Sequence, residues 1–321
     1  MKVRFWGTRG SIPVALTSDS IRSKLISALI EARGKSLETT SAIEAFVDHL
    51  PFAVRGTYGG HSSSLEVERG NEAASNSHIL FDFGSGARAL GQSMLARHGT
   101  TPQTYHVFMS HLHWDHIMGF PFFAPAYIPG NRIVIHSGHA EVATAFAAQQ
   151  EHPGFPVSFD QLGVQIEFDV IEPGCRVAIA DFCVTAKKQR HGGDSYGWRL
   201  ECDDRAVVYS TDSEHRIEDG DERLAFGRFF ADADLVVFDS MYSLADAISV
   251  KADWGHSSNI VGVELCQLAG ARRLALFHHE PASDDAQIDR VLAETRRFEA
   301  LTREGEALEI FSAYDGLVIG L

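Results

Sequence analysis

The sequence predicts an α/β (α+β) protein in which two β-sheets pack against each other with helices on the outside. Two observations predict this fold class: short apolar runs with strand character recur along the chain, and a few helical patterns are interleaved among them. The 321 residues, 45% of them hydrophobic, are enough to bury a large core. This length allows one large domain or two smaller ones, and we expect a single domain over residues 1–321.

The N-terminal part begins with a strand predicted at residues 2–6 and then changes character over residues 16–55. Apolar residues recur at helical spacing after Ser18. A second helix is expected from Ser41, where Ser41 and Glu44 form a capping box. We therefore predict a helical insertion whose apolar face packs on the main body or on a partner subunit, which leaves a homodimer possible.

The remaining elements follow from strand and helix patterns in chain order. Strands are predicted at 63–68, 78–83, 105–109, 132–136, 164–171, 176–187, 197–202, 206–210, 235–239, 273–277, 308–311 and 317–319. Helices are predicted at 87–98, 141–150, 257–268 and 286–302. Three prolines exclude a long helix from residues 119–130.

Charge and cysteine content restrict the possible partners. A formal charge of −15 disfavours a large nucleic-acid footprint, because phosphate backbones are bound by basic patches. No apolar stretch approaches the ~20 residues that span a bilayer, and no secretory signal is visible. The four cysteines form no C-x-x-C pair, which indicates reduced thiols. We therefore expect a cytoplasmic protein without a membrane partner.

The motif Ser-His-Leu-His-Trp-Asp-His at residues 110–116 places four potential metal ligands within six positions. It follows the apolar run at 105–109, so it lies where a buried strand opens into a loop. Extended spacing puts His111 and His113 on one side of the chain and lets Asp115 and His116 turn elsewhere. A single tetrahedral ion would not easily take all four, which favours two neighbouring ions, one bound by each pair.

Further polar residues stand at the ends of predicted strands, where α/β folds gather their sites. His191 follows one strand, Asp212 closes a second, and His278, followed by His279, closes a third. Their ordered recurrence after the first motif indicates the additional ligands that a two-metal site needs.

Together these residues resemble the metallo-β-lactamase superfamily, over most of the chain except roughly residues 16–55. In that family an H-x-H-x-D-H motif is followed by a single His, a single Asp and a final His. The resemblance implies a four-layer αββα sandwich with two bound divalent ions. One ion would be held by His111, His113 and His191, the other by Asp115, His116 and His278, with Asp212 as the bridge. Choosing His278 over His279 rests on the resemblance alone. Zinc suits the His-rich ligand set, with manganese or iron as possible substitutes.

Within the superfamily the chain is most similar to the phosphodiesterase branch, which includes the 3′-tRNA-processing endonucleases. The motifs that carry this likeness are Phe5-x-Gly-x-Arg-Gly-Ser, Tyr58-Gly59-Gly60, Phe81-Asp82-x-Gly-x-Gly, His113-Trp114-Asp115-His116 and Trp254-Gly255-His256-Ser257-Ser258. The last one resembles a His-Ser motif whose histidine assists departure of the leaving alkoxide. It falls just before a predicted helix, with Ser257 as its N-cap.

Substrate contacts are expected at three residues. His61 stands where relatives usually carry Asn, and the aromatic stretch at 119–130 is expected to line the substrate pocket through Phe123 and Tyr127. No basic Gly-Pro-rich insertion, like the arm that holds tRNA in tRNA-processing members, is visible. With the acidic charge, this argues against tRNA and favours a small-molecule phosphodiester.

The implied activity is hydrolysis of a phosphodiester by a metal-bound hydroxide. Asp115 would orient the nucleophile and His256 would protonate the leaving group. Asp82, Asp284 and His279 are candidates to orient ligand imidazoles. The main alternative is hydrolysis of a lactone, thioester or β-lactam on the same fold. A di-iron redox protein and a non-catalytic binding module are further alternatives, which the full ligand set disfavours.

Overall fold

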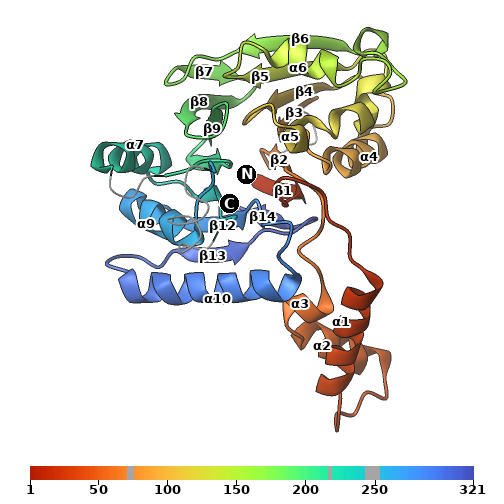
Figure 1. Ribbon diagram of the computed structural model, residues 1–321, viewed down its shortest axis with the longest axis vertical. Coiled ribbons are helices and arrows are strands. Elements are labelled where there is room, and N and C mark those ends of the chain that lie inside the picture. Colours follow the sequence, from red (N-terminus) through yellow and green to blue (C-terminus); the bar gives the residue numbers. More distant parts are fainter. Residues whose placement is uncertain (71–75, 216–218, 243–253) are drawn as a thin grey trace.

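The computed structural model describes residues 1–70, 76–215, 219–242 and 254–321, and in it two seven-stranded sheets face each other (Figure 1). The first sheet has the order β14 (Val318–Gly320), β1 (Lys2–Gly7), β2 (Ser64–Glu68), β3 (Ser77–Phe81), β4 (Thr104–Phe108), β5 (Arg132–Ser137) and β6 (Gln165–Val170). The second has the order β13 (Glu309–Ser312), β12 (Arg273–Phe277), β11 (Leu235–Asp239), β10 (Arg205–Ser210), β9 (Ser195–Cys202), β8 (Phe182–Gln189) and β7 (Arg176–Ile179).

Helices cover the outer face of each sheet, which gives the four layers that were expected (Figure 1). The first sheet is covered by α4 (Ala87–His98), α5 (Trp114–Ile117), α6 (Val142–Ala148) and the 3₁₀ turns η2 (Phe120–Phe122), η3 (Ala124–Tyr127) and η4 (Phe159–Gln161). The second is covered by α7 (Gly220–Phe230), α9 (Asn259–Ala269) and α10 (Asp285–Thr302). Among the described residues, every helix is too short or too polar to cross a lipid bilayer.

The central core lies between the two sheets and reaches the predicted metal motif through Trp198. This side chain is fully buried in the core cluster that both sheets share. Its indole Nε1 donates to the carbonyl oxygen of Met109 at 3.0 Å, and its ring lies 5.2 Å from that of Phe108. Since Met109 directly precedes residues 110–116, the second sheet holds the start of the motif in place.

The strand predicted at 176–187 is wrong, because two strands occupy this region. Strands β7 and β8 form a tight antiparallel hairpin that pairs Ile179 with Phe182. The chain turns at Ala180, which has a φ of 49°. Turns of this kind usually carry Gly, Asn or Asp, so an alanine gave no warning of the reversal. Helix α7 is absent from the predicted elements, although its Asp219 cap and acidic first turn are signals of a helix start.

The N-cap residues of two helices differ from those predicted. Thr39 caps α2 in place of Ser41. Ser258 caps α9 in place of Ser257, because the Ser257 hydroxyl donates to the carbonyl oxygen of Ser213 at 2.6 Å. In the second case a tertiary contact removes the side chain from its local role.

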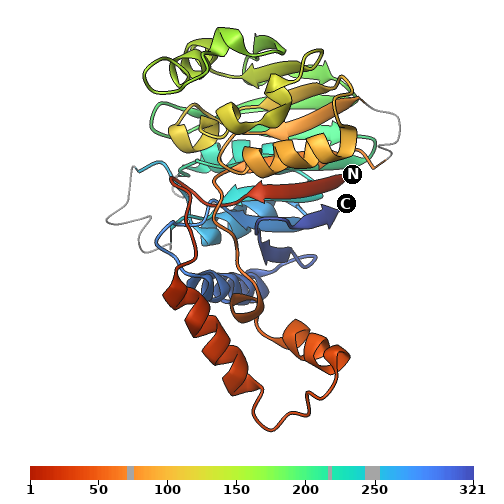
Figure 2. The same cartoon turned by 90° about the vertical axis from the view of Figure 1, so that its right-hand side faces the viewer.

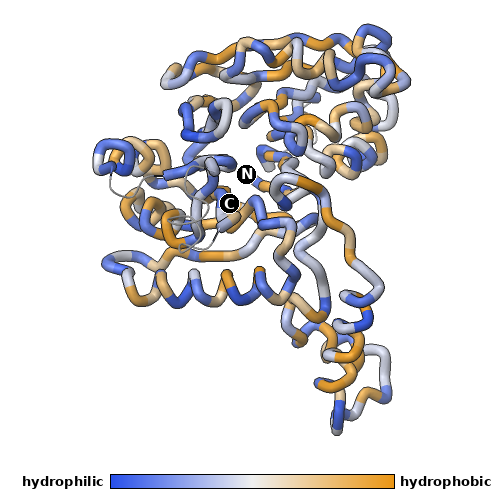
Figure 3. The backbone as a smooth tube through the Cα atoms, in the orientation of Figure 1, coloured by the Kyte–Doolittle hydropathy of each residue, from blue (hydrophilic) through white to orange (hydrophobic). Residues whose placement is uncertain are grey.

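Residues 16–55, which we call the arm, project away from both sheets (Figures 1 and 2). The arm consists of α1 (Ser18–Glu31), α2 (Thr40–His49) and α3 (Phe52–Arg55), and α3 attaches it to α10. Lys24 of α1 pairs with Asp285 at 2.6 Å. Neither α1 nor α2 has a buried residue, and apolar segments run along the arm in Figure 3. Of the two positions predicted for its apolar face, the main body is therefore wrong, and a partner subunit stays a prediction.

We predict that Trp198→Phe lowers the free energy of unfolding by about 1–3 kcal/mol, because the buried Met109 carbonyl loses its donor while most ring packing stays. Urea unfolding followed by circular dichroism measures the change. Trp114→Phe is the matched control, since Trp114 is 73% exposed, and it should leave the urea midpoint unchanged. An equal shift in both variants would contradict this role of Trp198.

Candidate metal centre

The candidate centre is assembled from residues that end or follow strands. These are Asp82 after β3, His111 after β4, His191 after β8, Asp212 after β10, Asp239 at the end of β11 and His278 after β12. Strands β10, β11 and β12 run parallel, as do β3 and β4, so their carboxyl ends meet at common edges. Asp82, Asp212 and His278 have φ values of 52°, 50° and 59°. This left-handed conformation turns each side chain away from its strand direction.

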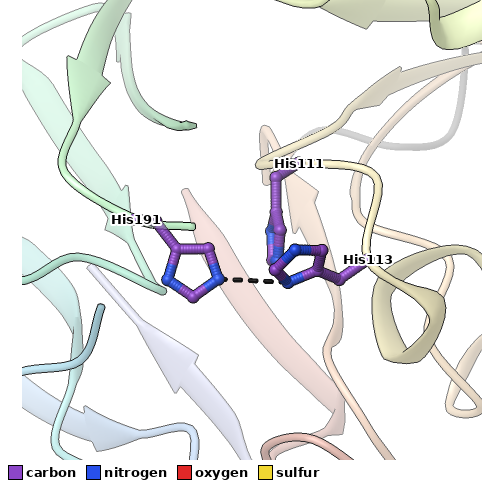
Figure 4. A group of neighbouring side chains, drawn as sticks. All are labelled: His111, His113 and His191. Atoms are coloured by element: carbon purple, nitrogen blue, oxygen red, sulfur yellow. Dashed lines mark hydrogen bonds between the residues drawn. The ribbon is translucent and has the colours of Figure 1, made fainter. Parts of the chain in front are cut away.

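The first group of potential ligands contains His111, His113 and His191 (Figure 4). One ring nitrogen of each lies within 4.8 Å of the others, and Nε2 of His191 is 3.1 Å from Nδ1 of His113. His191 comes from the second sheet and the other two follow β4 of the first. His111 is buried whereas His113 is exposed, so the group spans from the interior to solvent.

The second group contains Asp115, His116 and His278, all buried. Oδ2 of Asp115 is 3.2 Å from Nε2 of His116 and 3.6 Å from Nε2 of His278. The buried carboxylate of Asp212 lies between the two groups. Its Oδ2 is 3.2 Å from Nε2 of His116, and its Oδ1 is 3.8 Å from Nε2 of His111. The residues predicted to bind and bridge two ions are therefore brought together.

Asp82 orients this cluster from within the protein. Its Oδ2 accepts hydrogen bonds from Nδ1 of His116 and from the hydroxyls of Ser110 and Tyr209, each at 2.7 Å. Its Oδ1 accepts the backbone N–H of Ser110 at 2.7 Å. Because Nδ1 of His116 donates to Asp82, its Nε2 is the nitrogen that faces the cluster.

The unsatisfied nitrogens of the cluster fit a bound metal. Nε2 of His111, His116 and His278 are buried and make no contact with hydrogen-bond geometry, although carboxylate oxygens lie 3.2 Å from Nε2 of His116. Buried polar atoms normally have partners. Imidazole nitrogens with neighbouring carboxylates form the ligand set of zinc and similar divalent transition metals, so these residues fit such ions.

The pKa values of the cluster also fit a site for a bound cation. Burial is the largest cause that lowers the pKa of His111, His113 and His191, which keeps these imidazoles neutral with free lone pairs. Burial also acts to lower the pKa of His116. Its neighbouring carboxylates, Asp115 foremost, outweigh that effect and raise its pKa well above the ordinary value. The position therefore attracts positive charge.

His256 lies beside the cluster and is held by Asp239. Its Nδ1 is 2.8 Å from Oδ2 of Asp239, and its ring lies 5.1 Å from that of His191 and 5.0 Å from that of His278. Burial lowers the pKa of His256, but the charge and hydrogen bond of Asp239 outweigh it and raise the pKa to about 9. The sequence prediction missed Asp239, although it closes an apolar strand just as Asp212 does.

Two glycines leave room for the imidazoles. Gly255 has a φ of 83° and its carbonyl oxygen accepts from Nδ1 of His191 at 2.8 Å. A Cβ atom there would lie 2.4 Å from that nitrogen. A Cβ atom on Gly10 would lie 2.5 Å from the ring of His278. Both glycines belong to motifs that carried the family resemblance, and both are required by close packing.

The geometry distinguishes His278 from His279. Nε2 of His278 lies 3.3 Å from Oδ1 of Asp212, whereas Nε2 of His279 lies 2.9 Å from the carbonyl oxygen of Ala313. Asp284, another candidate to orient ligands, caps α10 instead. Of the proposed orienting residues, Asp82 contacts a ligand imidazole directly.

The prediction that Phe123 lines the substrate pocket is wrong. Its ring is fully buried and packs 5.1 Å from that of Phe83 and 5.2 Å from that of Tyr105. The 3₁₀ spacing of this stretch turns Phe120 and Phe123 toward the core together. Phe122 is 56% exposed instead.

The other two predicted substrate contacts stay predictions. Tyr127 is 39% exposed, and its hydroxyl donates to the carbonyl oxygen of Pro121 at 2.6 Å. His61 is partly buried, and its Nδ1 lies 3.2 Å from Oγ of Ser85.

Sequence comparison relates this chain to known proteins. The family described as the Beta-lactamase superfamily domain matches residues 77–279. Ribonuclease Z from Acaryochloris marina is 25% identical over 251 residues, covering 63% of this chain and 76% of that protein. Some of the other matched ribonuclease Z sequences are covered over only about half of their length, as in Staphylococcus epidermidis at 48%, whereas the one from Natronomonas pharaonis is covered over 98% at 25% identity.

Solved structures share the fold. The metallo-beta-lactamase fold protein YhfI from Bacillus subtilis has a TM-score of 0.64 at 17% identity, covering 99% of this chain and 98% of that one. Human tRNase Z, short form, has a TM-score of 0.60 at 16% identity, covering 100% and 99%. At these identities the likeness concerns the fold, and it confirms the predicted αββα sandwich.

The comparisons also correct one expectation. The sequence argued against tRNA as a partner, but the matched relatives are named ribonuclease Z and a tRNase Z shares the fold. Net charge averages over the whole surface, so it does not decide what one site binds. The expected hydrolase class is confirmed by these relatives. Because the family match spans more than half of the chain, this protein belongs to the metallo-β-lactamase superfamily.

Proposed function

We propose that the protein is a metal-dependent phosphodiesterase with a dinuclear centre, and that RNA is among the phosphodiesters it cleaves. The observation that carries the proposal is the pair of ligand groups that share the Asp212 carboxylate. Two divalent ions held side by side there would form a clamp suited to displacement at phosphorus. The ribonuclease Z relatives support RNA as a substrate class.

In this proposal His111, His113 and His191 would hold one ion, and Asp115, His116 and His278 would hold the other, with the Asp212 carboxylate between the two groups. Divalent ions bound there would make water nucleophilic at neutral pH and neutralise charge on the phosphoryl oxygens. Zinc suits this His-rich set, and manganese or iron can replace it.

Side chains of the protein would orient the nucleophile and protonate the leaving group. Asp115 would orient the attacking water as well as bind metal. Asp239 fixes Nδ1 of His256, so Nε2 of His256 is the nitrogen that gives its proton to the leaving oxygen. The four cysteines are free thiols, which supports a reducing compartment such as the cytoplasm.

A substrate panel tests the proposal. It contains bis-p-nitrophenyl phosphate, 2′,3′-cyclic nucleotides and an RNA with a 3′ trailer, beside a lactone, a thioester and a β-lactam. We expect turnover of the phosphodiesters that is lost with a chelator and regained with zinc. Turnover confined to the carbon esters or the lactam would reject the phosphodiesterase proposal and favour another hydrolase of this fold.

We predict about two metal ions per chain by elemental analysis of protein purified without chelator. Asp212→Ala should reduce this content, because its carboxylate approaches imidazoles of both groups. A maximum of one ion that Asp212→Ala leaves unchanged would refute the dinuclear centre.

Asp82→Asn should weaken metal affinity by about 10–100-fold, because the amide no longer fixes the His116 tautomer. Competition with a chromophoric chelator measures this affinity. Asp169→Asn is the matched control, since Asp169 accepts from Nδ1 of His136 at 2.8 Å in the same sheet but outside the cluster. Equal losses in both variants would show that the effect is not specific to the centre.

His256→Ala should retain its metal and lower kcat by roughly 10²–10⁴-fold with an alkoxide leaving group. The loss should be much smaller with p-nitrophenolate, which departs without a proton. Steady-state kinetics on both substrate types and elemental analysis measure this. Equal losses for both leaving groups, or loss of metal, would assign His256 another role.

A further inference from the structure

Two of the four tryptophans in the chain are engaged by the protein and two are not. Trp198 is fully buried and hydrogen-bonded, and Nε1 of Trp6 donates to Oε2 of Glu66 at 3.1 Å. Trp114 and Trp254 are 73% and 63% exposed. Within the described residues, neither of these two indoles makes a hydrogen bond or a ring contact. Tryptophan is highly buried on average, so two exposed indoles without partners are unusual.

Both exposed indoles adjoin the first group of potential metal ligands. Trp114 lies directly after His113, and Trp254 lies directly before Gly255. The carbonyl oxygen of Gly255 accepts from Nδ1 of His191 at 2.8 Å, and Nε2 of His191 lies 3.1 Å from Nδ1 of His113. A continuous path of bonds and contacts therefore joins one tryptophan to the other through two imidazoles of the centre.

The two indoles come from different sheets and lie toward solvent. Trp114 begins α5 after β4 of the first sheet, and Trp254 follows β11 of the second sheet and precedes α9 in the chain. His113, the neighbour of Trp114, is the exposed member of its ligand group, whereas Asp115 and His116 are buried. A molecule that enters the centre from this side meets one indole from each sheet.

Two aromatic platforms beside a metal centre suit a diester. A phosphodiester carries one substituent on each of two oxygens, whereas a phosphomonoester carries only one. Nucleobases stack on aromatic side chains whatever their sequence, because every base has a π-face. Proteins that recognise single-stranded RNA bind its unstacked bases against aromatic side chains in this way.

Binding through bases reconciles an RNA substrate with the formal charge of −15. Basic patches bind nucleic acid through its phosphates. Stacking needs aromatic surface in place of positive charge, and divalent ions at the centre would neutralise the phosphate that is cleaved. An acidic protein can therefore hold the nucleotides beside the cut by their bases.

We infer that Trp114 and Trp254 bind the nucleobases on the two sides of the scissile phosphate by stacking. The inference rests on the proposed phosphodiesterase function and adds the part of the substrate that these side chains recognise. Both tryptophans are substrate-binding residues, and neither takes part in bond cleavage. Stacking that is equal in the ground state and the transition state changes KM and leaves kcat unchanged.

Nucleotide binding tests the inference without turnover. The probe is AMP, and ribose 5-phosphate is its match because it carries the same sugar and phosphate without a base. On zinc-loaded protein, AMP should quench indole fluorescence and bind about 5–150-fold more tightly than ribose 5-phosphate by calorimetry. Trp114→Ala combined with Trp254→Ala should abolish this difference, and replacement of both by Phe should retain part of it. Leu301→Ala is the control, since Leu301 is 78% exposed on α10, and its affinities should stay at wild-type values.

Cleavage of RNA tests each tryptophan separately. At the position that is cut in the RNA with a 3′ trailer, one abasic nucleotide is placed before or after the scissile phosphate. Trp114→Ala and Trp254→Ala should each raise KM on the intact RNA by about 5–150-fold. Each variant should lose this effect on one of the two abasic RNAs, and the two variants should respond to different ones.

Several results would overturn the inference. These are equal affinities of wild-type protein for AMP and ribose 5-phosphate, or RNA turnover whose KM neither variant changes. The second result leaves the proposed phosphodiesterase function intact. Absence of all phosphodiester turnover rejects the proposed function instead, and AMP binding then still decides whether the indoles hold bases. Quenching by glycerophosphocholine but not by AMP would assign the indoles to a quaternary ammonium group and overturn the inference.

Discussion

The buried carboxylate of Asp212 is the constraint on which the centre depends. Burial alone would raise its pKa, but the surrounding imidazoles, His278 and His116 foremost, hold its pKa well below the ordinary value. A buried charge is tolerated only when it is paired. The ends of strands from both sheets therefore converge on this carboxylate, and a divalent cation would satisfy the imidazole nitrogens that protein groups leave without partners.

The same arrangement, a carboxylate that holds an imidazole through Nδ1, occurs twice around Asp212. Asp82 binds Nδ1 of His116, and Asp239 binds Nδ1 of His256. In each case a carboxylate at a strand end fixes one nitrogen of an imidazole and leaves the other for chemistry. In our proposal the imidazole of His116 binds metal and that of His256 gives a proton to the leaving group. Neighbouring strand ends therefore supply the two functions of a phosphodiesterase, metal binding and proton transfer.

The arm is packed differently from the main body. Ser20, Ser23 and Ser27 of α1 line a cavity beside the sandwich, whereas Leu25 and Leu29 are exposed, so the arm adds little to the core. The loop before the arm also belongs to the centre, since Gly10 touches the ring of His278.

The sequence by itself determined the two-sheet fold class and the dense ligand motif, because strand periodicity and ligand spacing are local properties of the chain. It also indicated His191, Asp212 and His278, since polar residues that close apolar strands are visible one strand at a time. Only the tertiary structure decided that Asp239 holds His256, because 17 residues separate them and their contact depends on where α9 packs. It likewise decided that Phe123 is core, and that the apolar side of the arm faces away from the protein. Those outcomes depend on contacts between distant segments, which no local pattern records.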